Sequence, residues 1–145
     1  MIYHHANTLW QPFWTVFTGA TVIALGKIIE SLCVNPIISY KKVIGEISYQ
    51  LVFYAREYTS PSLKPKMYEE ATQKFRESAS RLQTYFNPIS WMHLWFIPSV
   101  EDVDKAAKAL MGLSNGIPPQ TSKDGVQNAK LATTIQKMLR IHHHE

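Results

Sequence analysis

The sequence predicts an all-α protein, with one N-terminal transmembrane helix followed by an antiparallel bundle of about four helices. Three observations support this fold class. The first charged residue of the 145-residue chain is Lys27. Beyond Pro36, apolar residues recur every three or four positions, which is the spacing of one buried helix face. Short stretches rich in proline, glycine and serine separate these segments, and such stretches are typical of turns.

The predicted transmembrane helix covers residues 9–32. Leu9 to Leu25 contains no charged residue, and a helix of that length measures about 26 Å, close to the ~30 Å hydrocarbon core of a bilayer. Extension to Leu32 supplies the missing length. Two other interpretations remain open for this segment, a buried helix of a soluble protein and a cleaved secretory signal.

Residues at the two ends of this segment suit the membrane interface. Trp10 and Trp14 lie near its start, and Lys27 lies near its end. Lysines follow the segment and none precedes it, so the positive-inside rule places residues 1–8 outside the cell and residues 33–145 in the cytoplasm.

Helical periodicity continues through the rest of the chain. Asn35 and Pro36 are typical of an N-cap and a first helical residue, and the apolar stripe that follows extends to Tyr58. Gly45 within it suggests a close helix contact. The charged residues Lys41, Lys42, Glu46, Arg56 and Glu57 lie off this stripe. Further helices are expected at residues 66–86, from a Ser99 cap to a stop at Asn115-Gly116, and at residues 126–141.

These segments make up a helical domain at residues 33–116, a loop at 117–125, and a C-terminal helix with its tail at 126–145. Seven apolar residues are expected to pack the helices together. They are Ile44, Ile47, Leu51, Tyr54, Phe75, Leu82 and Leu110.

A second uncharged stretch, residues 87–98, lies between two prolines and is too short to cross a bilayer. Trp91, Trp95 and Phe96 within it favour contact with the membrane interface. A hydrophobic connection that plugs the bundle is nearly as good an interpretation, and a ligand pocket is a third.

Several short patches resemble those of a group of small, uncharacterised bacterial single-pass membrane proteins. The similar features are the apolar N-terminal helix, Pro36, and the patches 43–47, 54–55 and 112–115. The resemblance covers roughly residues 9–117. It implies a location in the bacterial inner membrane and a helical architecture, and it implies no activity.

No motif for catalysis, for a cofactor or for a metal is present. His93 lies among apolar residues, and His142–His144 stand at the end of the chain. The net charge of +4 suits a domain beside an anionic leaflet, and interleaved acids and bases argue against nucleic-acid binding.

The sequence thus favours a non-enzymatic interaction or scaffolding protein. Its partners would be the lipid bilayer and either a second copy or another membrane or cytoplasmic protein. A small membrane-active toxin or regulator, which acts through the Trp-rich stretch, is the alternative. A membrane-bound enzyme that uses His93 is a weaker third.

Overall fold

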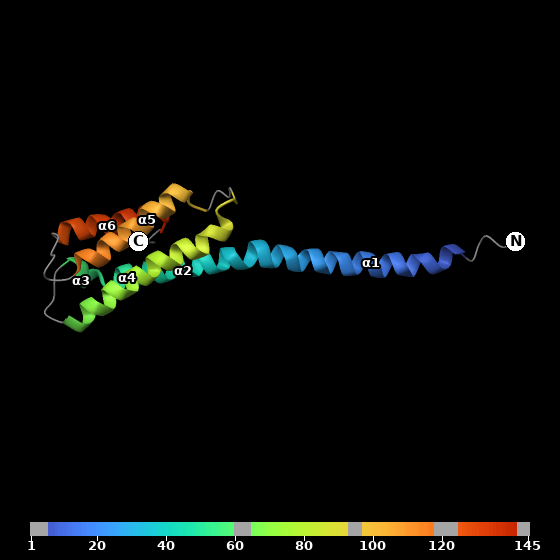
Figure 1. Ribbon diagram of the computed structural model, residues 1–145, viewed down its shortest axis with the longest axis horizontal. Helices are drawn as coiled ribbons and strands as arrows, with labels where there is room; N and C mark the ends of the chain where they lie inside the picture. Colours follow the sequence, from blue (N-terminus) through green and yellow to red (C-terminus); the bar gives the residue numbers. More distant parts are fainter. Residues whose placement is uncertain (1–5, 60–64, 93–96, 118–124, 142–145) are drawn as a thin grey trace. The chain divides into compact units, whose positions relative to one another are not determined.

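The computed structural model describes residues 6–59, 65–92, 97–117 and 125–141, and this part of the chain is helical, with turns and no β-strand. Figure 1 shows the elements in chain order. They are α1 (Ala6–Ile29), the π-helical segment η1 (Glu30–Val34), α2 (Asn35–Phe53), α3 (Ala55–Thr59), α4 (Pro65–Phe86), the 3₁₀ segment η2 (Asn87–Ile89), α5 (Val100–Gly116) and α6 (Gly125–Met138).

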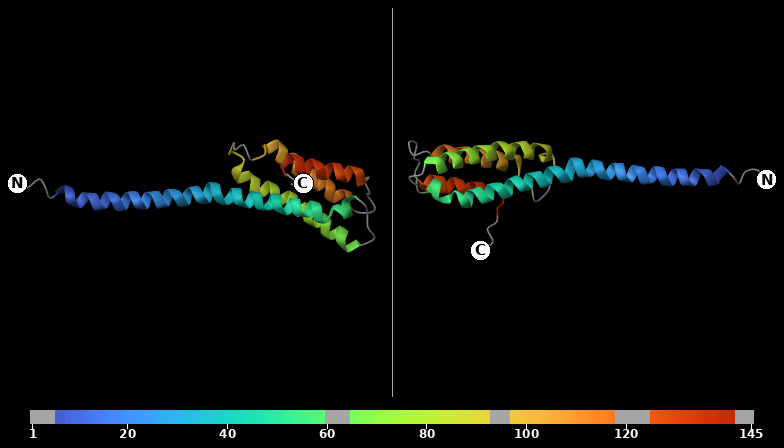
Figure 2. Two further views of the ribbon diagram at one scale, coloured as in Figure 1. Left: turned by 180° about the vertical axis from the view of Figure 1, so that it is seen from behind. Right: turned by 90° about the horizontal axis from the view of Figure 1, so that it is seen from below.

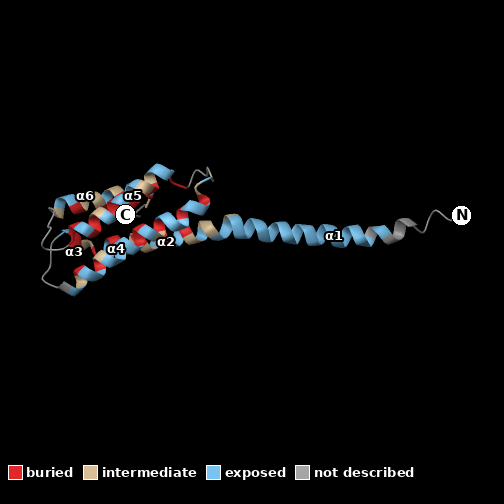
Figure 3. Cartoon of the chain, viewed as in Figure 1, coloured by how far each residue is buried: buried red, intermediate tan, exposed pale blue. Residues whose placement is uncertain are grey.

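The chain divides into two units, Met1–Asn35 and Pro36–Glu145. In the first unit, every described side chain of α1 is exposed, as the pale blue ribbon of Figure 3 shows. The hydroxyl groups of Thr18 and Thr21 donate hydrogen bonds to carbonyls four residues earlier, at 2.7 and 2.8 Å, so these polar groups are satisfied within the helix.

By length and composition, the helical run Pro12–Phe53 includes a segment able to cross a membrane. The buried core helix of a soluble protein meets the same criterion, but no part of this apolar segment is buried. The first unit therefore contains a long apolar helix, and the described side chains of this helix are not covered by other residues.

Asn35 is not the N-cap that the sequence suggests. Its backbone is right-handed helical, with φ −61° and ψ −44°, and its N–H donates to the carbonyl of Glu30. Pro36 lacks an N–H, and its ring would clash with the carbonyl four residues earlier in a regular α-helix. The wider π-helical turn of η1 lets the helical backbone continue through this position.

In the second unit, α2 and α4 run antiparallel (Figures 1 and 2). Their contacts join residues whose numbers rise along α2 and fall along α4. The pairs are Tyr40 with Phe86, Glu46 with Arg81, Gln50 with Ser78, and Tyr54 with Phe75. Gly112 and Gly116 of α5 approach Leu131 and Asn128 of α6 in the same reversed order, so these two helices are also antiparallel.

The helix predicted to extend to Tyr58 turns at Tyr54. The N–H groups of Glu57 and Tyr58 both donate to the carbonyl of Tyr54, at 3.1 and 3.3 Å, and α3 begins from this turn. Glu57 follows this turn in α3 and is buried, as is Tyr58. The prediction that Glu57 lies off the buried stripe is therefore wrong.

The start of α5 confirms the predicted Ser99 cap. The Ser99 Oγ accepts a hydrogen bond from the backbone N–H of Asp102 at 3.1 Å. The helix ends at Gly116, at the predicted stop, although Gly116 has no left-handed backbone. The last helix, α6, ends at Met138, three residues before the predicted end at Ile141.

Candidate functional site

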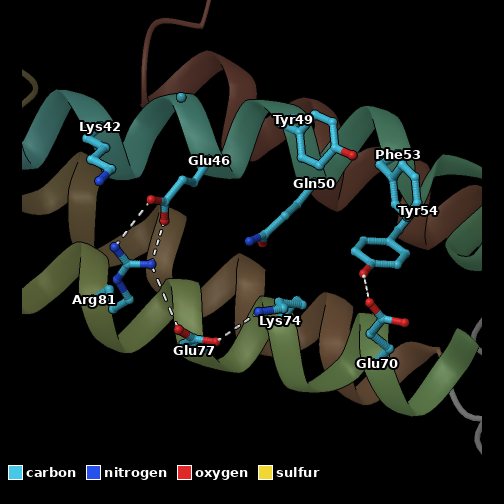
Figure 4. A pocket seen from close by; sticks show the side chains of 11 residues that line it. Lys42, Glu46, Tyr49, Gln50, Phe53, Tyr54, Glu70, Lys74, Glu77 and Arg81 are labelled. Atoms are coloured by element: carbon cyan, nitrogen blue, oxygen red, sulfur yellow. Dashed lines mark hydrogen bonds and ion pairs between the residues drawn. The ribbon is translucent and has the colours of Figure 1, made fainter.

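A groove of about 720 Å³ lies between α2 and α4, and Figure 4 shows its side chains. Both helices contribute to its walls because their antiparallel packing places one long face of each side by side. From α2 and the turn after it come Lys42, Gly45, Glu46, Tyr49, Gln50, Phe53 and Tyr54, and from α4 come Glu70, Lys74, Glu77 and Arg81.

A chain of ion pairs crosses one end of this groove. The Arg81 guanidinium donates to both carboxylate oxygens of Glu46, at 2.5 and 3.4 Å. Arg81 also lies 3.8 Å from the Glu77 carboxylate, which lies 3.6 Å from the Lys74 ammonium (Figure 4). Spacings of three and four residues place these α4 side chains on one face. The guanidinium fork therefore joins α2 to α4 with a defined geometry.

At the other end, the Tyr54 hydroxyl donates to the Glu70 carboxylate at 3.1 Å. Burial, followed by the hydrogen bond and negative charge of Glu70, raises the pKa of Tyr54 to about 12. The phenol therefore keeps its proton at neutral pH and remains a donor. Glu70 lies at this end of the groove, and Lys42 lies at the opposite end, close to the Glu46–Arg81 pair (Figure 4).

Gln50, another residue that lines the groove, is hydrogen bonded to a buried side chain of α4. The Ser78 hydroxyl donates to the side-chain carbonyl of Gln50 at 2.8 Å, and Ser78 is buried. This hydrogen bond satisfies a polar group that burial would otherwise penalise.

An aromatic shelf, defined as Tyr49 and Phe53, covers the α2 side of the groove. The side chains are 65% and 50% exposed, and their rings stack with centroids 5.5 Å apart. Val52 beside them is also exposed. A Cβ added to Gly45 would meet nothing within 4 Å, so the close helix contact predicted there is absent from the described chain. The groove combines an open apolar shelf with charged ends, which is the chemistry of a surface that binds an amphipathic helix.

The residues predicted to pack the helices belong to the hydrophobic core or pack against it. Six are buried, namely Ile47, Leu51, Tyr54, Phe75, Leu82 and Leu110, and Ile44 is partly buried. Trp10, Trp14 and Lys27 are exposed residues of α1. Trp91 is 64% exposed, and Trp95, Phe96 and His93 lie outside the described residues.

Sequence reasoning did not single out the Glu46–Arg81 pair or the aromatic shelf. The sequence predicts only that Glu46 lies off the apolar stripe, and its partner is 35 residues away in the chain. The aromatic shelf could have been predicted from the four-residue spacing of Tyr49 and Phe53, because that spacing places both rings on one helix face.

The described residues include no group of three or more histidine, cysteine, aspartate or glutamate side chains that could hold a metal. Comparisons with protein-family models, with curated proteins and with solved structures gave no match for this chain.

Proposed function

We propose that this chain is a membrane-anchored helical protein that acts by binding another protein and catalyses no reaction. The exposed apolar surface of α1 carries the proposal. Leaving apolar surface in water costs about 25 cal/mol per Å². A bilayer removes that cost over the whole helix, and Trp10, Trp14 and Lys27 would lie near its two interfaces.

The anchor would be oriented with the N-terminus outside a bacterial inner membrane. Lys27, Lys41 and Lys42 all follow the apolar segment, and the positive-inside rule keeps such residues in the cytoplasm. Residues 36–145 then form a cytoplasmic antiparallel bundle that carries the groove between α2 and α4.

Membrane fractionation and reporter fusions test the anchor. We expect the full chain to remain with membranes after carbonate extraction. A C-terminal fluorescent fusion should be bright and a C-terminal alkaline phosphatase fusion inactive. Recovery of the intact chain in the soluble fraction without detergent contradicts the anchor, and processing near Gly26 would instead support a secretory signal.

The groove would take an amphipathic helix of a partner protein. Lys42 and the Tyr54–Glu70 pair lie about 12 residues apart along α2, a distance of roughly 18 Å in a helix. The aromatic shelf lies between them. A complementary helix therefore carries an acid that meets Lys42, a base that meets Glu70, and apolar residues between the two.

A synthetic peptide with this pattern tests the groove. It carries a glutamate near one end, an arginine about twelve residues later, and leucines on the same face between them. We expect it to bind the full chain in nanodiscs, as measured by fluorescence polarisation. A peptide with glutamine at both charged positions should bind more weakly, and equal binding of both peptides rejects charge recognition.

Matched variants localise the binding. Phe53→Glu places a charge on the aromatic shelf and should abolish peptide binding, whereas Val126→Glu introduces the same side chain at an exposed position of α6. Loss of binding in both variants contradicts a specific groove. Self-association of the chain that the peptide does not displace would identify a second copy as the occupant.

A membrane-active toxin or regulator is the second candidate, and the exposure of Trp91 favours it. The indole N–H of Trp91 already donates to the carbonyl of Pro88 at 2.8 Å, so the ring can enter an apolar layer without losing a hydrogen bond. Growth arrest on induction that Trp91→Ser relieves would support this candidate over the interaction protein.

A further inference from the structure

Gln50 lies at the middle of the groove between α2 and α4. It comes eight residues after Lys42 and four residues before Tyr54, which lie at opposite ends of the groove. Figure 4 shows its side chain extending from α2 toward α4, between the ion pairs at one end and the Tyr54 hydrogen bond at the other. A helix bound in the groove would therefore cover Gln50.

The carbonyl end of the Gln50 amide is held by a buried partner. The Ser78 hydroxyl donates to the Gln50 Oε1 at 2.8 Å, and Ser78 is 2% exposed. Because a side-chain amide is planar, a fixed Oε1 restricts the positions that Nε2 can take. A carbonyl oxygen has two lone pairs, so Oε1 can accept one more hydrogen bond.

The other end of the amide, Nε2, is unpaired and accessible. It donates no hydrogen bond to any described residue. Gln50 is partly exposed, and Nε2 is not among the buried side-chain atoms of the described chain that lack a partner, so solvent reaches it. Water is its acceptor in the unbound protein. A helix that covers the groove displaces this water, and a donor left without an acceptor weakens binding.

The charged α4 side chains on either side of Ser78 already pair with one another. Glu77 lies 3.8 Å from Arg81 and 3.6 Å from Lys74. Both cations thus have a carboxylate, and a partner carboxylate at this level would lose its water without gaining a cation of its own. A side-chain amide carries no charge and offers both a donor and an acceptor. It therefore matches the two open positions of the Gln50 amide.

We propose that the groove selects a partner helix by a side-chain amide, asparagine or glutamine, at the middle of that helix's apolar face. The amide would accept a hydrogen bond from the Gln50 Nε2 and donate one to the Gln50 Oε1. One polar pair within an apolar contact fixes the register of two helices, because a shift leaves both amides unpaired. This inference rests on the helix-binding function proposed above and specifies the partner.

The test uses three forms of the peptide described above. The first has leucine at every apolar position. In the second, asparagine replaces the leucine about eight residues after the glutamate, at the level of Gln50. In the third, asparagine replaces the leucine about four residues after the glutamate. The full chain in nanodiscs is titrated into each peptide, and fluorescence polarisation gives the dissociation constants.

The second peptide should bind about tenfold more tightly than the third. These two peptides have the same composition, so overall hydrophobicity and charge cannot account for a difference. If the all-leucine peptide binds and the other two bind equally or not at all, the amide recognition is overturned and the groove stands. If the all-leucine peptide does not bind, the helix-binding function itself fails.

Variants assign this preference to Gln50. Gln50→Leu should abolish the tenfold preference and leave binding of the all-leucine peptide intact. Gln127→Leu makes the same change at an exposed position of α6 and should keep the preference. A preference that both variants retain, or that both lose, overturns the assignment to Gln50.

Two further measurements test the positioning by Ser78 and the neutrality of the partner group. Ser78→Ala should reduce the preference while the all-leucine peptide binds as before, whereas a damaged fold would weaken all three peptides. An unchanged preference rejects the positioning step. A fourth peptide, with aspartate at the level of Gln50, should bind the parent chain more weakly than the asparagine peptide. Tighter binding of the aspartate peptide would identify a carboxylate as the partner group and overturn the amide.

Discussion

The Asn128 side chain lies directly against Gly116 and joins α6 to the ends of two other helices. Its Nδ2 donates to the carbonyl of Gly116 at 3.2 Å and to the carbonyl of Tyr58 at 3.0 Å. Both carbonyls belong to last turns, of α5 and α3, where no intrahelical partner exists. One buried amide thus satisfies the C-terminal ends of two helices that are far apart in the chain.

Gly116→Ala should destabilise the folded unit. A Cβ at this position would lie 2.4 Å from the Asn128 Oδ1, and the buried amide is held by its two hydrogen bonds. Overpacking of this kind costs about 1–3 kcal/mol. Gly45→Ala is the matched control, because its Cβ would meet nothing within 4 Å, and it should stabilise α2 by roughly 0.5–1 kcal/mol. Urea unfolding followed by circular dichroism measures both changes, and equal effects would contradict the contact.

Asn128→Ala should cost more than an ordinary helix substitution. It leaves the carbonyls of Tyr58 and Gly116 buried without this donor, at about 1–3 kcal/mol for each unsatisfied group. Gln127→Ala, at the exposed neighbouring position, should change the free energy of unfolding by less than about 0.5 kcal/mol. If the two variants unfold at the same urea concentration, the amide does not join the helices.

Local features of the fold could be predicted from the sequence because the information lies within one helix. The periodicity of residues 66–86 predicts α4 to within one residue of its observed start at Pro65. Ser99 and Asp102 lie close in sequence and form the predicted cap. The absence of charge before Lys27 likewise predicts the long apolar helix α1.

Features that depend on contacts between helices could not be predicted in this way. The turn at Tyr54 interrupts a stripe whose periodicity continues, and only the packed structure shows that Glu57 becomes buried. The groove requires the antiparallel register of α2 and α4, which brings Glu46 to Arg81. The sequence contains Glu46 and Arg81 but does not show that their side chains are close in space.

Stability should fall in alkaline solution through the range of roughly pH 10–12. Burial and the contact with Glu70 raise the pKa of Tyr54 from 10.0 to about 12. Between these values the unfolded chain loses the phenolic proton that the folded chain retains, so the free energy of unfolding decreases as pH rises. Below pH 10 this contribution is fully present.

Tyr54→Phe provides the comparison for this pH dependence. The variant lacks the titrating phenol, so its stability should decline less steeply between pH 10 and 12, although Tyr40 and Tyr58, whose pKa values burial also raises, still contribute. Urea unfolding at a series of pH values gives the slopes. Identical slopes for parent and variant would remove Tyr54 as a source of the alkaline loss.

Arg140, two residues after the end of α6, has a left-handed backbone with φ 54°, and it is the only non-glycine residue of the described chain with a positive φ. The N–H of Ile141 donates to the carbonyl of Gln136 at 2.9 Å, and the N–H of Arg140 donates to the carbonyl of Lys137 at 3.3 Å. These two bonds form a Schellman motif, in which glycine is the preferred residue at the left-handed position.

Arg140→Gly and Arg140→Ala should therefore differ in stability although both remove the guanidinium. A non-glycine residue in the left-handed region is strained by about 1–2 kcal/mol, whereas glycine adopts it freely. After allowance for the greater freedom of glycine in the unfolded chain, we expect the glycine variant to be the more stable by roughly 1 kcal/mol. Urea unfolding of the two variants, both purified in maltoside micelles, measures the difference in their free energies of unfolding. An alanine variant that equals or exceeds the glycine variant would show that the last turn of α6 can unwind without cost to the folded unit.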